Sequence, residues 1–204
     1  MKSFSNQGYE EEAPTLVDHY ERISFEDAHR HVLEFFPKNP AQIVDIGSGT
    51  GRDVAFLASQ GHHVVAVEPT HALRNAAMTL HPSPRIEWID DGFPKLEKIA
   101  NREAKFDLAL MSAVWMHLDP AEQEQAMPVV ASLLKTGGLV IMNLRHGPVP
   151  EGRRMFEISD VDMCKLAGEH RLFPIHQQKG ESILKRNQDA GVTWSHFVFR
   201  KAES

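Results

Sequence analysis

A glycine-rich turn between an apolar strand and a helix constrains this chain more than any other feature of its sequence. The run Ile43 to Ile46 is apolar except for Asp45, and it leads directly into GSGTG at 47–51. From Arg52 to Gln60, apolar residues recur at helical spacing. Because glycine lacks a Cβ atom, the backbone of such a turn can approach a ligand closely. The pattern predicts a strand, a tight turn and a helix that bind a flat or phosphorylated ligand.

The spacing of these glycines narrows the choice of ligand. A dinucleotide-binding turn reads GxGxxG, but here the pattern is GxGxG and Arg52 stands where the third glycine of that motif should fall. A Walker loop needs GK followed by Ser or Thr, and no such sequence follows this turn. NAD, NADP and FAD are therefore disfavoured as ligands.

Strand and helix patterns alternate along most of the chain. Apolar runs predict strands at 43–46, 64–67, 86–89, 106–111, 139–144, 174–177 and 193–200. Helical spacing and capping residues predict helices at 25–36, 52–60, 71–80, 95–100, 119–136 and 160–168. Residues 1–15 lack periodicity and are expected to form a mobile arm. The alternation predicts an α/β fold with a mostly parallel sheet covered by helices on both faces.

Composition limits the size, location and partners of the protein. Its 204 residues fit one α/β domain, and its net charge of −6 disfavours nucleic acid as a partner. The single cysteine, Cys164, allows no internal disulfide, which fits a reducing cytoplasm. The N-terminus is polar and acidic, and no run of about 18 apolar residues occurs. We therefore expect a cytoplasmic protein that does not enter a membrane.

Acidic residues end the second and third predicted strands. Glu68 follows VVAV and stands where a carboxylate can accept hydrogen bonds from both hydroxyls of a ribose. Asp90 and Asp91 end the next strand at the same edge of the sheet, where one of them can accept the exocyclic amine of adenine. Three carboxylates around one turn favour a nucleoside that carries positive charge and no phosphate.

Read in order, these segments resemble the class I S-adenosylmethionine-dependent methyltransferases. The resemblance is carried by VDIGSGTG at 44–51, Glu68 after VVAV, the Asp90-Asp91 pair, FDLALMSAVWMHL at 106–118 and LLKTGGLVIM at 133–142. It covers about half of the chain, from Val44 to Leu144. Thr136 departs from the family, which often has proline before the two glycines. The resemblance implies a Rossmann-like three-layer sandwich, with a seven-stranded, mostly parallel sheet and an antiparallel last strand.

The same resemblance implies a cofactor and the residues that hold it. The cofactor is S-adenosylmethionine, and the product is S-adenosylhomocysteine. Asp45, Gly47, Ser48 and Gly49 are expected at the methionine part, with Met111 and Ser112 beside them, and Glu68 at the ribose. The complete expected set is Tyr20, Asp45, Gly47, Ser48, Gly49, Glu68, Pro69, Asp90, Asp91, Met111 and Ser112. The implied organisation is an N-terminal arm and lid helix (1–36), a cofactor-binding core (41–144) and an acceptor-side segment with the last strands (145–204).

Methyl transfer depends mainly on holding donor and acceptor in line, so few residues are compulsory catalysts. His117 follows the fourth predicted strand and is a candidate general base; alternatively it packs against or caps the next helix. Trp115 is either an aromatic wall beside the sulfonium or part of the core. Arg145 and His146 leave the fifth predicted strand at the substrate edge of the sheet and are candidates for the acceptor site. No HExxH or comparable ligand spacing occurs, so no metal requirement is predicted.

Several functions stay open at this point. The leading interpretation is methyl transfer to a small-molecule acceptor by a monomer or homodimer. The same fold can serve another reaction of the sulfonium, such as an intramolecular cyclisation or a lyase reaction. A non-catalytic cofactor-binding protein is a further alternative, and an NAD(P) oxidoreductase is disfavoured by Arg52.

Overall fold

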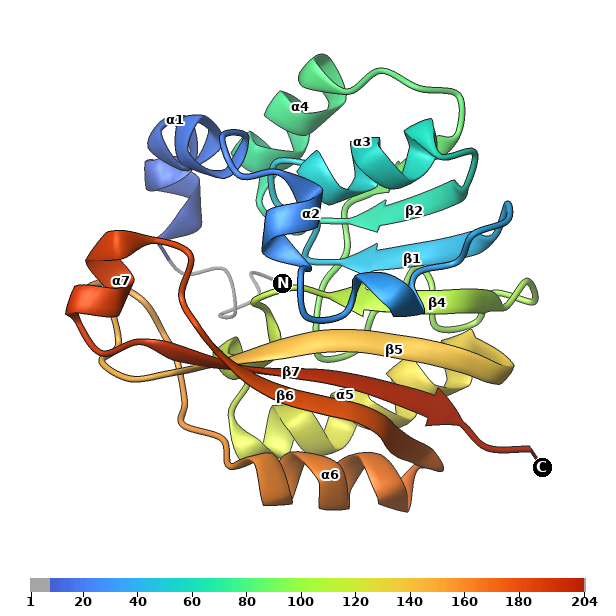
Figure 1. Ribbon diagram of the computed structural model, residues 1–204. Helices are drawn as coiled ribbons and strands as arrows, with labels where there is room; N and C mark the ends of the chain where they lie inside the picture. Colours follow the sequence, from blue (N-terminus) through green and yellow to red (C-terminus); the bar gives the residue numbers. More distant parts are fainter. Residues whose placement is uncertain (1–7, 204) are drawn as a thin grey trace.

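The strands of the chain pair into one mixed sheet in the computed structural model, which describes residues 8–203 (Figure 1). The strands are β1 Gln42–Ile46, β2 His63–Val67, β3 Ile86–Ile89, β4 Phe106–Met111, β5 Leu134–His146, β6 Leu172–Glu181 and β7 Thr193–Lys201. Their order is β3-β2-β1-β4-β5-β7-β6, and only β7 runs antiparallel to its neighbours. The predicted seven-stranded sheet with an antiparallel last strand is confirmed.

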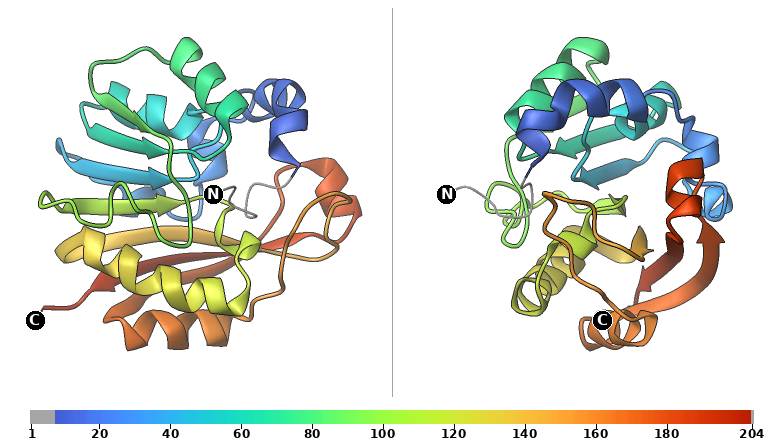
Figure 2. Two further views of the ribbon diagram at one scale, coloured as in Figure 1. Left: turned by 180° about the vertical axis from the view of Figure 1, so that it is seen from behind. Right: turned by 90° about the vertical axis from the view of Figure 1, so that its left-hand side faces the viewer.

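Helices cover both faces of this sheet (Figure 2). They are α1 Tyr9–Tyr20, α2 Phe25–Ala28, α3 Arg52–Ser59, α4 His71–Leu80, α5 Pro120–Leu133, α6 Asp160–Glu169 and α7 Lys185–Asp189, with short 3-10 turns at Leu33–Phe35 and Trp115–His117. Successive residues of a strand point to opposite faces. Ile43 accordingly joins the apolar cluster of α2 and α3, whereas Val44 joins the cluster of α5 and α6. The sheet therefore separates two apolar cores, one on each face.

The carboxyl ends of the parallel strands bring several loops to one edge of the sheet. The glycine turn follows β1, Glu68 follows β2, Ser112 follows β4, and Arg145 lies near the end of β5. Helices α1 and α7 both lie beyond this edge, on the left in Figure 1, although they come from opposite ends of the chain. Open α/β sheets bind ligands at such an edge.

The N-terminal segment differs from the prediction of a mobile arm. Residues 1–7 lie outside the described part of the chain, but from Tyr9 onward the segment is helical and belongs to α1. Leu16 is buried against Leu73 of α4, and the Glu10 carboxylate accepts a hydrogen bond from the Ala72 amide at 3.2 Å. The prediction was wrong because burial of a few apolar residues, rather than a long periodic stripe, holds this helix in place.

The predicted helix over 25–36 was also wrong. Ser24 caps a helix as expected, accepting from the Asp27 amide at 3.0 Å, but α2 ends at Ala28. At the next position the His29 ring turns inward to bond the Asp53 carboxylate at 2.9 Å. This tertiary contact outweighs the local helical pattern, which resumes only as a 3-10 turn at Leu33–Phe35.

Three further segments depart from the sequence-based expectations. Residues 95–100 form turns instead of a short helix, because Leu96 has a φ of 49°, which a right-handed helix does not allow. The glycines 137–138 lie inside β5, which begins at Leu134 and bulges opposite Asp107. Helix α7 was not predicted. No helix within residues 8–203 combines the length and the apolar content that crossing a bilayer requires.

Candidate active site

A cavity of about 620 Å³ lies at the carboxyl edge of the sheet, among the loops that the sequence marks as functional. Ten of the predicted site residues line it: Tyr20, Asp45, Gly47, Ser48, Gly49, Glu68, Pro69, Ser112, His117 and Arg145. Residues expected to hold the cofactor and residues expected at the acceptor thus share one space. A volume of this size is typical of a small-molecule binding site.

The glycine turn adopts a conformation that requires glycine. Gly47, Gly49 and Gly51 have φ values of 78°, 57° and 82°, all in the left-handed region. The Gly47 amide donates to the Val67 carbonyl at 2.7 Å, and a Cβ atom at this position would come within 2.4 Å of a Val114 methyl group. Gly49, by contrast, has open space where its Cβ would be. The turn is therefore fixed against the protein at Gly47 and open toward the cavity at Gly49.

Two polar side chains in this part of the cavity, Ser48 and Glu68, differ in their hydrogen bonding. The Ser48 hydroxyl is buried and has no hydrogen-bond partner within residues 8–203. Glu68 is only 4% exposed, and its two carboxylate oxygens accept from the Gly49 amide at 2.8 Å and the Thr70 amide at 2.7 Å. Each carboxylate oxygen can accept more than one hydrogen bond, so Glu68 keeps capacity for a ligand.

Burial raises the pKa of Glu68, whereas the hydrogen bonds from Thr70 and Gly49 and the nearby Arg74 act in the opposite direction. The Arg74 guanidinium also donates to the Glu68 carbonyl at 2.6 Å. These donors stabilise the ionised carboxylate in a place where water cannot. Glu68 is therefore a fixed acceptor rather than a freely solvated acid.

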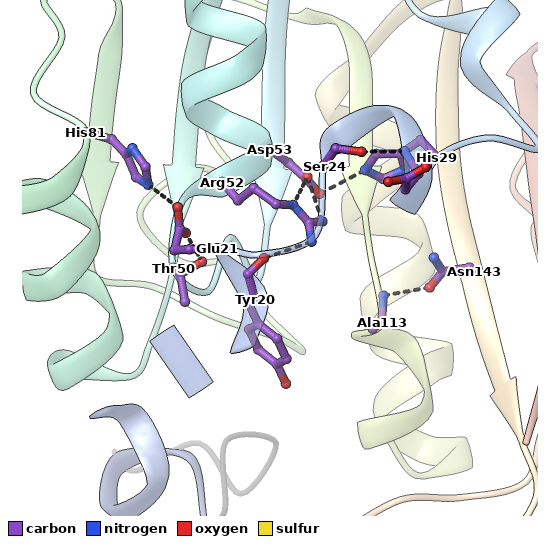
Figure 3. A network of polar contacts seen from close by, with 11 residues as sticks. Tyr20, Glu21, Ser24, His29, Thr50, Arg52, Asp53, His81, Ala113 and Asn143 are labelled. Carbon is purple, nitrogen blue, oxygen red and sulfur yellow. Dashed lines mark hydrogen bonds and ion pairs between the residues drawn. The ribbon is translucent and has the colours of Figure 1, made fainter. Parts of the chain in front are cut away.

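A buried charge cluster lies next to the glycine turn (Figure 3). Burial would raise the pKa of Asp53, but His29 at 2.9 Å and Arg52 at 2.7 Å lower it below its usual value. Asp45 is also buried, and burial together with the neighbouring Asp53 raises its pKa well above the usual value. Negative charge is thus concentrated on Asp53, and Asp45 is poised to gain a proton or to bind a cationic group.

The end of the N-terminal helix is tied to the same turn. Glu21, just after α1, accepts from the Thr50 hydroxyl at 2.5 Å and contacts the His81 ring at 3.2 Å. The Arg52 guanidinium also reaches the Tyr20 carbonyl at 3.5 Å. These contacts place Tyr20 at the cavity, where the sequence had suggested a lid.

The loop after β4 is fixed from the neighbouring strand. Asn143 of β5 accepts from the Ala113 amide at 2.7 Å (Figure 3). Ala113 has a φ of 57°, which is uncommon for a residue other than glycine and needs such support. Ser112 and Asn143 both line the cavity. The strained loop therefore has a defined position beside the glycine turn.

His117 is held in one neutral form by two hydrogen bonds. Its Nδ1 lies 2.7 Å from the Arg154 carbonyl, which can only accept, so Nδ1 carries the proton. Its Nε2 is therefore the bare nitrogen and accepts from the Tyr9 hydroxyl at 3.1 Å. Burial lowers the pKa of His117, and the nearby Arg153 and Arg154 add to this, although the hydrogen bond to the Arg154 carbonyl opposes it. A neutral imidazole with its lone pair at the cavity can accept a proton.

The predicted adenine ligands lie outside the cavity lining. Asp90 is exposed and pairs with Arg74 at 3.1 Å. The Asp91 carboxylate accepts from the Gly92 amide at 2.9 Å and from the Lys98 amide at 2.7 Å, and so it orders its own loop. Of this segment, Gly92 and Phe93 reach the cavity.

Three other predicted site residues also lie outside the lining. Met111 and Trp115 are fully buried, and Trp115 packs edge-on against Phe93 with ring centroids 5.5 Å apart. The environment of Trp115 is thus the packed core that the sequence left as its alternative. The His146 ring bonds the Ser195 hydroxyl at 2.9 Å, which turns it away from the cavity.

The structure adds cavity residues that the sequence analysis did not select, namely Tyr9, His31, Arg153 and His196. The Arg153 guanidinium lies 3.8 Å from the centre of the Tyr9 ring and pairs with Glu12 at 2.6 Å. These residues come from α1, from the loop before β1 and from the C-terminal part of the chain. Because these segments lie far apart in the sequence, the spacing of residues could not predict that they share a cavity. The helix of Tyr9 was not predicted because the sequence around this residue is mostly acidic.

His196 gives the fold a dependence on pH. Burial and the neighbouring His31 lower its pKa to about 4, whereas an unfolded histidine titrates near 6.5. Between these values the unfolded chain binds a proton that the folded chain does not, so stability is lost as the pH falls from about 6.5 to about 4. One group contributes at most about 1.4 kcal/mol per pH unit to this loss. In His196→Gln, the free energy of unfolding measured with urea should change less between pH 7 and pH 5 than in wild type. Exposed His63→Gln is the control and should behave like wild type. The same pH dependence in wild type and His196→Gln would contradict this.

No group of three or more His, Cys, Asp or Glu residues within 8–203 is arranged to hold a metal ion. The histidines that do lie close together, His31 and His196 with ring centroids 4.7 Å apart, have no acidic residue completing a ligand set in that region.

The fold and the cavity together define a class of protein. The strand order with an antiparallel β7, the GxGxG turn after β1 and the buried acid after β2 are the features of a class I S-adenosylmethionine-dependent methyltransferase. A family comparison agrees, since residues 43–138 match the family described as "Methyltransferase domain". This match covers just under half of the chain and, together with the fold, supports a class I S-adenosylmethionine-dependent methyltransferase.

Individual relatives are distant. An uncharacterized methyltransferase of Alkaliphilus oremlandii is 29% identical over 105 residues, which cover 52% of this chain and 46% of that protein. The N-methyltransferase NodS of Bradyrhizobium japonicum, solved with S-adenosylhomocysteine, has a TM-score of 0.73 at 15% identity, covering 98% of this chain and 100% of that one. A Burkholderia thailandensis 1,6-didemethyltoxoflavin-N1-methyltransferase has a TM-score of 0.64 at 18% identity, covering 98% and 80%. The chain spans about half the length of the curated relatives it matches, and the structural likeness concerns the fold.

Proposed function

We propose that this chain binds S-adenosylmethionine in the cavity and transfers its methyl group to a small-molecule acceptor. The observation that carries the proposal is the buried Glu68 carboxylate, oriented by the Gly49 and Thr70 amides beside an open glycine turn. The family match over residues 43–138 supports the same reaction. The fold neighbours solved with S-adenosylmethionine or S-adenosylhomocysteine support the same cofactor.

The residues of the cavity fit this cofactor in three respects. The open side of Gly49 admits a ligand against the backbone, and the unpartnered Ser48 hydroxyl can hydrogen-bond a carboxylate or an amine. Glu68 supplies an acceptor for vicinal hydroxyls. The raised pKa of Asp45, caused by burial and then by Asp53, leaves it suited to a cationic neighbour such as an ammonium group.

On this proposal, the turn from Asp45 to Gly49 holds the methionine part, and Glu68 with Pro69 holds the ribose. Tyr20 and Ser112 complete the wall on either side, with Met111 packed behind Ser112. The adenine role predicted for Asp90 or Asp91 stays a prediction, supported only by Gly92, which follows Asp91 and lines the cavity.

The bound cofactor supplies an electrophilic methyl group on a sulfonium. The contribution of the protein is then largely positional, because a fixed in-line approach can account for roughly 7 to 11 kcal/mol of the barrier. His117 can take the proton that an acceptor hydroxyl or ammonium group loses, since its Nε2 is unprotonated and the residue lines the cavity. Tyr9, which bonds that nitrogen here, would have to yield it to the acceptor.

A product assay tests the proposed function directly. The purified protein is incubated with methyl-labelled S-adenosylmethionine and a broad panel of small acceptors, and the nucleoside product is identified. We expect S-adenosylhomocysteine together with labelled acceptor. Methylthioadenosine as the product would instead indicate an intramolecular or lyase reaction. Cofactor binding without any turnover would favour a non-catalytic role, and a thermal shift with NADH but not with S-adenosylhomocysteine would reinstate the oxidoreductase.

His117→Gln should lower kcat by about 10²-fold or more, because general-base catalysis typically contributes 10² to 10⁴. Affinity for S-adenosylhomocysteine should stay within about twofold of wild type, since His117 is not among the residues expected to hold the cofactor. Single-turnover rates and calorimetric binding measure the two effects separately. Exposed His63→Gln is the matched control. An unchanged rate in His117→Gln would remove His117 as the base.

A further inference from the structure

The cavity is unevenly charged. Its glycine-turn side carries the buried acids Asp45 and Glu68, which are the acids expected around a cationic nucleoside. Five arginines also line the cavity: Arg52 directly follows the glycine turn, whereas Arg30, Arg145, Arg153 and Arg186 come from other segments. Five of the twelve arginines of this acidic chain therefore line one cavity.

Three of these arginines have partners within the protein. Arg52 pairs with Asp53 at 2.7 Å, and Arg153 pairs with Glu12 at 2.6 Å. Arg30 donates to the carbonyl of Glu181 at 3.1 Å. Their charges or donors are at least partly satisfied without a ligand.

Arg145 and Arg186 differ from these three. Within residues 8–203, neither side chain forms a hydrogen bond or an ion pair. Arg145 is half-buried near the end of β5, opposite Trp194 of β7, whereas Arg186 is exposed on α7 at the mouth of the cavity. Burial lowers the pKa of Arg145, and the nearby Tyr9 phenol acts in the opposite direction.

The remaining acids of the lining do not compensate Arg145. Glu12 is taken by Arg153, and Asp27 and Glu181 are exposed at the rim. A half-buried guanidinium without an anion loses hydration and gains nothing in return. Its planar set of donors matches a carboxylate or a phosphate better than any neutral group.

We propose that the acceptor of this enzyme is a small anion, bearing a carboxylate or a phosphate ester, and that Arg145 binds the anionic group inside the cavity while Arg186 attracts it at the mouth. This proposal rests on the proposed function, because only a methyltransferase has a methyl acceptor. Such a contact would place the rest of the acceptor between Arg145 and the glycine turn. Trp194, which lines the cavity beside Arg145, offers that part an apolar surface.

Binding to the protein saturated with S-adenosylhomocysteine tests this proposal. The probes are a set of carboxylates and phosphate monoesters of graded size, each paired with its neutral amide or alcohol, for example benzoate with benzamide and phenyl phosphate with phenol. Affinities are measured by calorimetry at constant ionic strength. We expect at least one anion to bind about ten- to a hundredfold more tightly than its neutral partner, as charge-assisted hydrogen bonds allow. Carboxylates and phosphates are compared to decide which source of the anion fits.

Arg145→Gln should abolish that preference, and Arg145→Lys should restore part of it because the charge remains while the paired donors are lost. Arg200→Gln, which removes an exposed arginine on β7 away from the cavity, should bind like wild type. Equal binding of anions and neutral partners, or no binding of any anion, overturns the proposal. If Arg145→Gln instead loses S-adenosylhomocysteine, Arg145 binds the carboxylate of the cofactor, and the acceptor proposal fails while the proposed function stands. If wild type does not bind S-adenosylhomocysteine at all, the proposed function itself fails.

Discussion

Glu68→Gln is expected to weaken binding of S-adenosylhomocysteine by about ten- to a hundredfold, because hydrogen bonds to a charged acceptor contribute about 1.5 to 3 kcal/mol. The carboxylate accepts from the Gly49 amide at 2.8 Å and the Thr70 amide at 2.7 Å, and it lines the cavity. An amide in its place brings an NH₂ group against one of these donors. Both the charge and the orientation that the ribose hydroxyls would use are lost.

Calorimetric titration measures the change in affinity, and circular dichroism checks that the variant is folded. Glu87→Gln is the matched control, since Glu87 is an exposed acid on β3 that pairs with Arg102 and does not line the cavity. A folded Glu68→Gln protein with the affinity of wild type would show that Glu68 supports the loop only and does not contact the ligand.

Gly47→Ala is expected to destabilise the protein by about 2 to 5 kcal/mol. A φ of 78° costs a residue with a Cβ atom roughly 1 to 2 kcal/mol. The added methyl group would also meet a Val114 methyl at 2.4 Å, and overpacking of this kind costs about 1 to 3 kcal/mol. Urea unfolding measures the sum.

Gly137→Ala separates the two contributions. Gly137 has a φ of 76°, nearly that of Gly47, but no atom lies within 4 Å of the position that an added Cβ would take, so only the backbone cost should appear. Combining Gly47→Ala with Val114→Ala should recover the packing part of the loss. Equal destabilisation in Gly47→Ala and Gly137→Ala would contradict the proposed contact with Val114.

Sequence patterns located the elements whose structure is decided locally. The helix at 71–80 and the strands at 86–89 and 106–111 occur with the predicted bounds, because a regular apolar period or a short apolar run is sufficient to define them. The prediction failed where contacts between residues far apart in the sequence determine the secondary structure. Helix α2 ends before His29, whose ring bonds Asp53, and α1 forms because Leu16 is buried against α4.

The residues of the candidate site also fall into those that local sequence predicts and those that depend on distant contacts. The glycine turn and Glu68 are contiguous with their strands, and so the sequence predicted their place at the cavity. Tyr9 and Arg153 lie far apart in the chain, yet they stack at 3.8 Å. For Asp90 and Asp91, the sequence predicted the position at a strand end. It did not predict the hydrogen-bond and ion-pair partners of their carboxylates.

Helix α1 touches both halves of the cavity. Tyr9 bonds His117 and stacks with Arg153 at the arginine side, whereas Arg52, beside the glycine turn, reaches the carbonyl of Tyr20. A ligand that contacts α1 from one side and orders this helix reduces the conformational entropy that is lost when a second ligand binds on the other side. If the protein binds a methyl donor and an acceptor as proposed, thermodynamic linkage then requires each to raise the affinity for the other by the same factor. Cooperativity between two substrates would follow from one shared helix, without any contact between them.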